Sequence, residues 1–130
     1  MSNPGLARWH EFAKKSNPDT LDDIIADEAV FHSPIVHTPQ EGKALVKMYL
    51  TAAGVVFFSD KFKYVGEWLS DDGVVLEFQT EMDGIKVNGV DMIRFDEAGQ
   101  IIEFKVMIRP LKAINMVHQK MMAMLEQQNS

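Results

Sequence analysis

One acidic residue interrupts the apolar pattern of a predicted strand: Asp91, within residues 87–95. Successive strand residues point to opposite faces, so Asp91 shares a face with the apolar side chain of Ile93. A carboxylate buried among apolar side chains is costly unless it is paired, protonated or used in chemistry. Because Arg94 and Arg109 fall on the opposite parity, we expect desolvation to raise the pKa of Asp91. Asp91 is thus the first candidate for a proton donor or acceptor.

Three further polar side chains are candidates for such chemistry: His32 and Ser33 precede Pro34, and His37 follows it. Histidine titrates near neutral pH and serves widely as a general base. Strand alternation puts His32 and Ser33 on opposite faces of the strand. The alternative to a catalytic role, for His32 and for His37, is a half-exposed histidine that is hydrogen-bonded to the backbone. The spacing of the two histidines matches no established ligand motif. We therefore expect no metal ion and no cofactor.

Large apolar and aromatic residues either line a pocket or fill a core, and the two uses look the same in sequence. Core packing is expected for Trp9, Tyr64, Trp68, Phe78, Phe104 and Ile108. If a pocket opens among them, the candidate ligand-binding residues are Trp9, His37, Tyr49, Tyr64, Phe78, Phe104 and Ile108.

The elements that position these residues change in kind along the chain. Helical spacing predicts a helix around residues 6–13, a short helix after Asn17 that includes Ile25, and a third helix that residues 40–42 open. A brief strand is expected between them, over residues 29–33. Alternation then predicts hairpin-linked strands over 61–69, 74–82 and 87–95, a last strand that Pro110 ends, and an amphipathic helix over 111–127. This order predicts an α+β fold, with an antiparallel sheet covered by helices on one face.

Composition narrows the classes of partner. The chain has 130 residues, and we expect one domain over residues 1–130. A net charge of −6 argues against a nucleic-acid backbone or an anionic membrane as partner. No apolar run approaches the roughly 20 residues of a membrane-spanning helix, and the N-terminal residues lack a signal-peptide pattern. The absence of cysteine excludes disulfides and thiolate chemistry. Because no export signal is seen, the expected location is the cytoplasm.

The sheet face away from the helices has a mixed composition. Val65, Leu69, Met92 and Met107 alternate there with side chains of both charges. A mixed, self-complementary face suits a twofold homodimer. The alternative is a solvated sheet surface.

Two segments in this layout resemble the nuclear transport factor 2-like superfamily, which includes ketosteroid isomerases and SnoaL-like polyketide cyclases. Residues 26–42 are similar to the family's stretch from the second helix through a short strand into the third helix. Residues 91–101, with Asp91, Arg94, Phe95 and Gly99, are similar to its D-x-x-R-F-x-x-x-G-x-I hairpin. The resemblance implies a cone: a curved sheet wrapped around N-terminal helices, with a deep pocket at one end. The C-terminal helix is extra relative to a minimal isomerase.

Carried over by position, the resemblance implies roles for individual residues. Asp91 falls where ketosteroid isomerase keeps a protonated aspartic acid that donates to the developing oxyanion. Ser33 falls where the isomerase has its proton-shuttling aspartate. Trp9 falls near its oxyanion-hole tyrosine, and Leu50 at a supporting tyrosine. A serine without its own base cannot shuttle protons near neutral pH, so the isomerase mechanism is not expected.

Cyclases of the superfamily need less, namely one acidic group that protonates and deprotonates a substrate poised for ring closure. The resemblance therefore implies an isomerase- or cyclase-like enzyme that acts by acid–base chemistry on a small hydrophobic carbonyl compound. Its predicted catalytic residues are Asp91, His32 and Ser33. The alternative is a non-catalytic domain of the same fold that binds a small ligand or a protein. An enzyme should present at least two polar groups converging near Asp91, whereas a binding module suits a closed or wholly apolar pocket.

Overall fold

A computed structural model describes residues 4–15 and 17–128 of the chain, so residues 1–3, 16 and 129–130 of the expected domain lie outside the described residues. The helices are α1 (Pro4–Lys15), the 3-10 helix η1 (Pro18–Thr20), α2 (Leu21–Ile24), α3 (Lys43–Phe57) and α4 (Leu111–Gln128). The strands are β1 (Ile25–His32), β2 (Gln40–Glu41), β3 (Lys63–Leu69), β4 (Gly73–Met82), β5 (Ile85–Phe95) and β6 (Ile101–Arg109).

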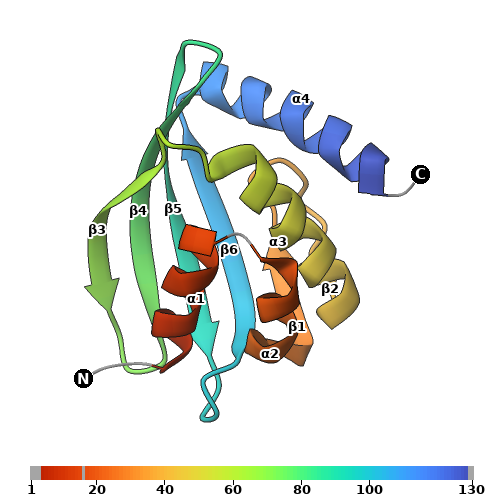
Figure 1. The fold of residues 1–130 in the computed structure, drawn as a ribbon, viewed down its shortest axis with the longest axis vertical. Coiled ribbons are helices and arrows are strands. Elements are labelled where there is room, and N and C mark those ends of the chain that lie inside the picture. Colours follow the sequence, from red (N-terminus) through yellow and green to blue (C-terminus); the bar gives the residue numbers. More distant parts are fainter. Residues whose placement is uncertain (1–3, 16, 129–130) are drawn as a thin grey trace.

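The strands form one six-stranded sheet in the order β2-β1-β6-β5-β4-β3. The β1–β6 pair is parallel and all the other pairs are antiparallel, so the sheet is mixed rather than wholly antiparallel as predicted. The sheet curves around α1, α2 and α3, which lie on its inner face, and α4 lies beside α3 (Figure 1). The predicted α+β cone with a C-terminal helix is confirmed.

The second helix is shorter than the sequence predicts. Ile25 lies in β1 rather than in α2, where it pairs with Ile101 of β6. A helix that continued through Ile25 would forgo this sheet pairing, and β-branched residues fit a strand better than a short helix. Sheet pairing therefore decides the boundary.

The prediction that Trp68 belongs to the core is wrong. Its side chain is 58% exposed, whereas that of Trp9 is 2% exposed. A bulge between Tyr64 and Gly66 shifts the alternation of β3, so that Trp68 pairs with Val75 and shares its outward face. Tyr64, which precedes the bulge, pairs with Phe78 and stays on the inner face.

The C-terminal helix is held to the fold by its first half. Ala113 and Val117 of α4 are fully buried against Phe57 of α3 and Val87 of β5. The second half of α4 carries Met121, Met122, Met124 and Leu125, which are half-buried or exposed. No described helix is both long and apolar enough to cross a membrane.

Candidate functional site

A chain of two hydrogen bonds joins three side chains from three elements. The indole Nε1–H of Trp9 in α1 donates to the Tyr64 hydroxyl at 2.9 Å. That hydroxyl in turn donates to Oδ2 of Asp91 at 2.7 Å. Tyr64 and Asp91 lie on strands that are separated by β4, so the phenol reaches diagonally across Phe78. Gly89, opposite Phe78, has no side chain to obstruct that route.

Burial makes both acidic groups weaker acids than they are in water. Burial raises the pKa of Asp91 from 3.8 to about 7, and the hydrogen bond from Tyr64 opposes this shift. Burial also raises the pKa of Tyr64 well above 10.0, and the neighbouring Asp91 charge adds to that effect. Tyr64 is therefore a neutral donor near pH 7, while Asp91 is present there in both protonation states.

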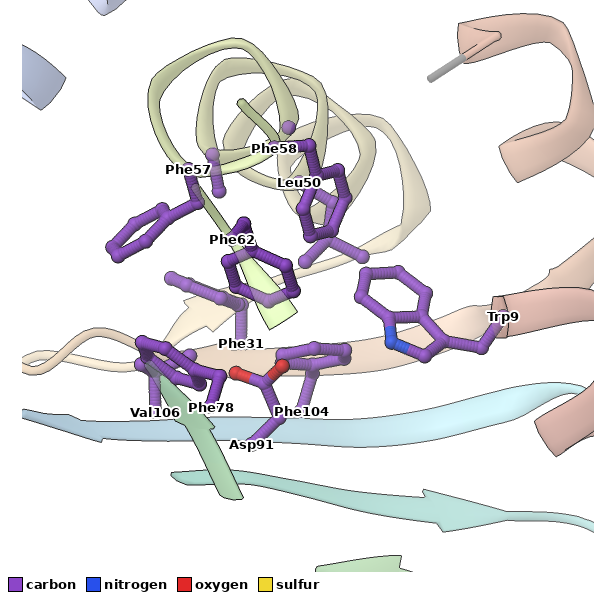
Figure 2. A pocket seen from close by; sticks show the side chains of 12 residues that line it. Trp9, Phe31, Leu50, Phe57, Phe58, Phe62, Phe78, Asp91, Phe104 and Val106 are labelled. Carbon is purple, nitrogen blue, oxygen red and sulfur yellow. The ribbon is translucent and has the colours of Figure 1, made fainter. Parts of the chain in front are cut away.

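Asp91 reaches a small cavity that is otherwise almost wholly apolar. We call it the inner cavity; its volume is about 30 Å³, and the carboxyl group of Asp91 points up among the surrounding rings (Figure 2). Ligand pockets typically enclose roughly 300–1,000 Å³, so this cavity is far smaller than a typical ligand pocket. Its walls are Trp9, Phe31, Leu50, Ala53, Gly54, Phe57, Phe58, Phe62, Phe78, Phe104 and Val106.

The structure distributes the sequence-predicted site residues over three places. Trp9, Phe78 and Phe104 line the inner cavity with Asp91, and Tyr64 bonds to that carboxyl. The other predicted residues do not line it. Ser33 and Tyr49 line a neighbouring compartment beneath α4, and His32, His37 and Ile108 line a surface hollow beside β6.

The two predicted catalytic residues other than Asp91 have local partners. Ser33 Oγ accepts hydrogen bonds from the backbone N–H groups of Ile35 at 3.0 Å and Val36 at 3.3 Å. It thus stabilises the turn after β1. His32 lies on the outer side of the sheet, where its Nε2 is 3.2 Å from Glu103 Oε2.

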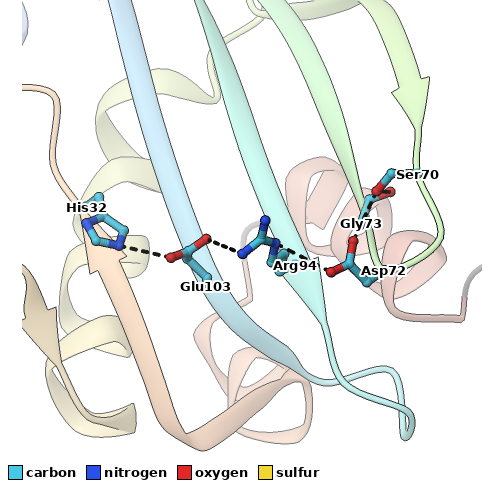
Figure 3. Close-up of polar contacts among 6 residues, drawn as sticks. All are labelled: His32, Ser70, Asp72, Gly73, Arg94 and Glu103. Atoms are coloured by element: carbon cyan, nitrogen blue, oxygen red, sulfur yellow. Dashed lines mark hydrogen bonds and ion pairs between the residues drawn. The ribbon is translucent and has the colours of Figure 1, made fainter.

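Glu103 links His32 to a row of charges across the sheet (Figure 3). Its other oxygen lies 3.6 Å from Arg94 Nη1, and Arg94 Nε lies 3.5 Å from Asp72 Oδ2. These exposed ion pairs tie β1, β6, β5 and the turn before β4 together. They face away from the inner cavity.

Sequence reasoning missed several functional contacts. The four phenylalanines Phe31, Phe57, Phe58 and Phe62 wall the inner cavity, although no motif marks them. It also missed the bond between Tyr64 and Asp91. The Tyr64 phenol reaches Asp91 across β4 because of the β3 bulge and because Gly89 has no side chain. Alternation alone predicts neither feature.

The site can present a polar pair to a ligand in an apolar enclosure. The Tyr64 hydroxyl donates to Oδ2 of Asp91, and within the described residues no hydrogen bond reaches the second carboxyl oxygen. A protonated Asp91 can donate from that oxygen, and an ionised one can accept a proton there. Among the described residues, no three His, Asp or Glu side chains gather into a metal-binding group.

Several solved structures of known proteins resemble this chain. A steroid delta-isomerase from Pseudomonas aeruginosa is 34% identical, with 95% of this chain and 90% of that chain covered and a TM-score of 0.90. An NTF2-like protein of unknown function from Mesorhizobium loti is 19% identical, with 82% and 88% covered and a TM-score of 0.70. An epoxide hydrolase/cyclase-like enzyme, SalBIII, is 16% identical, with 81% and 88% covered and a TM-score of 0.65. The last two show the fold alone.

The comparison with curated proteins gives no match. The model of the SnoaL-like domain matches residues 6–104, which span α1 to the middle of β6 and include Trp9, Tyr64 and Asp91. The chain therefore belongs to the SnoaL-like family, within the nuclear transport factor 2-like superfamily.

Proposed function

We propose that this protein is an acid–base enzyme of the isomerase or cyclase kind that acts on a small hydrophobic carbonyl compound. Asp91 carries the proton and Tyr64 holds it in place. In the protonated state, Asp91 donates a hydrogen bond to the substrate carbonyl oxygen. In the ionised state, it takes a proton from the carbon next to the carbonyl and returns it to another atom of the substrate.

The observation that carries this proposal is the hydrogen-bonded chain from Trp9 through Tyr64 to Asp91 at the wall of an apolar cavity. A group that gives and takes protons works best when its pKa lies near the working pH, and the pKa of Asp91 is about 7. The likeness to a steroid delta-isomerase supports a carbonyl substrate. The resemblance places Trp9 of α1 and Leu50 of α3 where ketosteroid isomerase has tyrosines. In this chain Tyr64 of β3 supplies a phenol beside Asp91 instead.

Exchange of carbon-bound protons tests this proposal without knowledge of the natural substrate. We expect the protein to accelerate deuterium exchange at the carbon next to the carbonyl of 2-butanone, followed by proton NMR in D₂O. A positioned acid–base group contributes roughly 10² to 10⁴-fold, and Asp91→Asn should remove that contribution. Ser33→Ala, in the neighbouring compartment, should retain it. A wild-type protein that binds the ketone but leaves its exchange rate unchanged would refute catalysis.

The second candidate function is a non-catalytic domain that holds an apolar ligand. The small inner cavity favours it, because a volume of about 30 Å³ leaves no room for a substrate without movement of the walls. Binding without exchange in the experiment above is the result that this second function predicts.

We also propose that two copies associate through the outer sheet face, which we define by Trp68, Val75, Val90, Met92 and Met107. Register places Trp68, Val75 and Met92 in one row across β3, β4 and β5. Val90 and Met107 form the next row. Charged residues of both signs surround these apolar side chains, which supports a self-complementary interface.

A further inference from the structure

A hollow with polar walls lies at the end of the sheet where β4 turns into β5 and β6 leads into α4 (Figure 1). We call it the polar hollow, and its volume is about 790 Å³. That volume falls within the roughly 300–1,000 Å³ of typical ligand sites. Phe62 lines both the polar hollow and the inner cavity, but none of the charged side chains of the hollow lines that cavity.

Strand pairing sets four polar side chains of the polar hollow in one row. Lys63 of β3 pairs with Gln79 of β4. Gln79 pairs with Asn88 of β5, which pairs with Arg109 of β6. Directly paired residues point to the same face of a sheet, and the residues on either side of this row in β4 and β5 are buried against the inner face. The row therefore faces outward, and every member of it carries N–H donors.

Positive charge is in excess in the polar hollow, although the whole chain has a net charge of −6. The charged side chains that line it are Lys61, Lys63, Lys86, Arg109, Asp60 and Glu81. Lys61 is paired, with its Nζ 3.1 Å from Glu81 Oε2. Within the part of the chain that the structure describes, no ion pair engages Lys63, Lys86 or Arg109. An anion that enters the hollow would supply the missing counter-charge.

Asn88 orients Arg109 at one end of the row. Its Nδ2 donates to the backbone carbonyl of Phe78 at 2.9 Å and to Glu77 Oε2 at 3.0 Å. These two bonds fix the amide group, so its oxygen is left to accept from Arg109 Nη1 at 3.5 Å. The guanidinium keeps further N–H groups for a ligand. A planar guanidinium binds two oxygens of one phosphate or carboxylate group at once.

We propose that the polar hollow binds a ligand that carries two or more linked phosphate groups. The row crosses three strand spacings of about 4.8 Å, so Lys63 and Arg109 leave the sheet about 14 Å apart. A chain of linked phosphates can follow such a row, whereas a single phosphate meets only one part of it. All the residues of the site come from one chain, and its charged groups are outside the inner cavity, so this binding is independent of the proposed catalysis.

Titration with inorganic anions tests the proposal. Phosphate, pyrophosphate and citrate are added separately to the protein at low ionic strength, and the NMR signals of the backbone amides and of the Arg109 Nε–H group are followed. We expect one pyrophosphate to bind per chain, at least about tenfold more tightly than phosphate, with shifts centred on the row. Citrate carries several charges but no linked phosphates, and it should bind more weakly than pyrophosphate. Added salt should weaken all binding.

Neutral variants of the two ends of the row locate the ligand. Arg109→Gln and Lys63→Gln should each weaken pyrophosphate binding by about tenfold, because each removes a charge that bonds to a different part of the ligand. Lys14→Gln is the control, since Lys14 is an exposed cation of α1 that does not line the polar hollow. It should leave the affinity unchanged. All three side chains are exposed, so the variants should fold.

Removal of an acid should have the opposite effect. Glu81→Gln frees Lys61 and removes a negative charge from the hollow, so it should tighten pyrophosphate binding severalfold. Glu11→Gln is the matched control, because it breaks the Lys15–Glu11 pair of α1, also 3.1 Å long, and changes the net charge of the chain equally. It should not alter the affinity.

Several results would overturn the proposal. Among them are the absence of saturable pyrophosphate binding and an equal affinity for phosphate or citrate. Wild-type affinity in Arg109→Gln would place the anion elsewhere. If Glu11→Gln tightens binding as much as Glu81→Gln does, the net charge of the chain and not the polar hollow attracts the anion, and the proposal is wrong.

Discussion

Asp91 gives this fold a pH dependence that can be measured directly. Its pKa is raised from 3.8 to about 7, so the native state keeps this proton to higher pH than the unfolded chain does. Ionisation therefore costs stability; the cost begins near the unfolded pKa, grows towards the folded pKa and is fully present above it. Asp91→Asn removes the cost. At roughly 1.4 kcal/mol for each pKa unit, the variant should gain up to about 4 kcal/mol above pH 7 and nothing near pH 3.

Urea unfolding at several pH values checks this expectation. Asp71→Asn, which changes an exposed acid in the β3–β4 turn, is the control and should alter the free energy of unfolding little. Carbon-detected NMR titration of the Asp91 carboxyl should give a midpoint near 7. A midpoint at or below about 3.9, the ordinary value for aspartate, would mean a paired, ionised residue and would end the proton-donor role.

The Tyr64 hydroxyl takes part in two hydrogen bonds, one to Asp91 and one from Trp9. Tyr64→Phe removes both bonds and keeps the ring. Tyr64→Phe removes the bond that lowers the pKa of Asp91, so the NMR midpoint of Asp91 should rise above that of wild type. It also leaves the buried indole N–H of Trp9 without its acceptor, which should cost about 1–3 kcal/mol. Tyr49→Phe, in the compartment beneath α4, should leave the midpoint unchanged. An unaltered midpoint in Tyr64→Phe would show that the phenol does not stabilise the carboxylate.

The elements that carry these residues were largely predictable, and the exceptions have local causes. Alternation located β4, β5 and the inward side chain of Asp91, because a sheet covered on one face imposes a strict period of two. It failed in β3 for Trp68, where the bulge after Tyr64 reverses the faces. The composition of the inner cavity was predictable only in part, since its four unpredicted phenylalanines come from β1, α3 and the segment after α3.

Gly89 in β5 allows a close approach that an alanine would block. A Cβ atom there would meet the carbonyl oxygen of Met107 and lie 2.6 Å from Cζ of Phe78. Gly89→Ala should therefore destabilise the fold by about 1–3 kcal/mol and displace Phe78 from the inner cavity. Gly66→Ala is the control, because its Cβ would meet only the far edge of the exposed Trp68 ring, at 2.7 Å, and Glu77. Thermal unfolding that ranks Gly66→Ala as the more damaging variant would contradict this account.

The position of Ser33 bears on steroid isomerisation. Ser33 lies in the compartment beneath α4, where its hydroxyl accepts from two backbone N–H groups, and Phe31 and Phe57 stand between that space and Asp91. A serine without a base of its own cannot replace the missing general base. We therefore expect turnover of a Δ5-ketosteroid, followed by ultraviolet absorbance, to be lower by about 10² to 10⁴-fold than with a dedicated isomerase. Turnover at an isomerase's rate would mean that another base has been recruited.

The whole molecule has two sheet faces with different tasks. The inner face packs on the helices and holds Asp91, whereas the outer face carries exposed apolar side chains between charges. Trp68 is 58% exposed, Met107 51% and Met92 36%. The ion pairs of Arg94 and Glu103 cross this face (Figure 3). Exposed pairs contribute little to stability, so we expect their main effect to be complementarity in the proposed dimer.

A twofold dimer through this outer sheet face is the prediction that follows for the assembly. A typical interface covers about 800 Å² of each partner, roughly a tenth of the 7494 Å² surface of this chain. The two apolar rows and the charged residues around them suit a patch of that size. A twofold axis brings this face of one copy against the same face of the other. Light scattering at micromolar concentration should give twice the chain mass of 14.7 kDa.

Met92→Lys combined with Met107→Lys should give 14.7 kDa, because four buried ammonium groups would face each other across the axis. Leu111→Lys, which changes a residue 72% exposed at the start of α4, should remain dimeric. A wild-type mass of 14.7 kDa would show that the outer sheet face is a solvated surface.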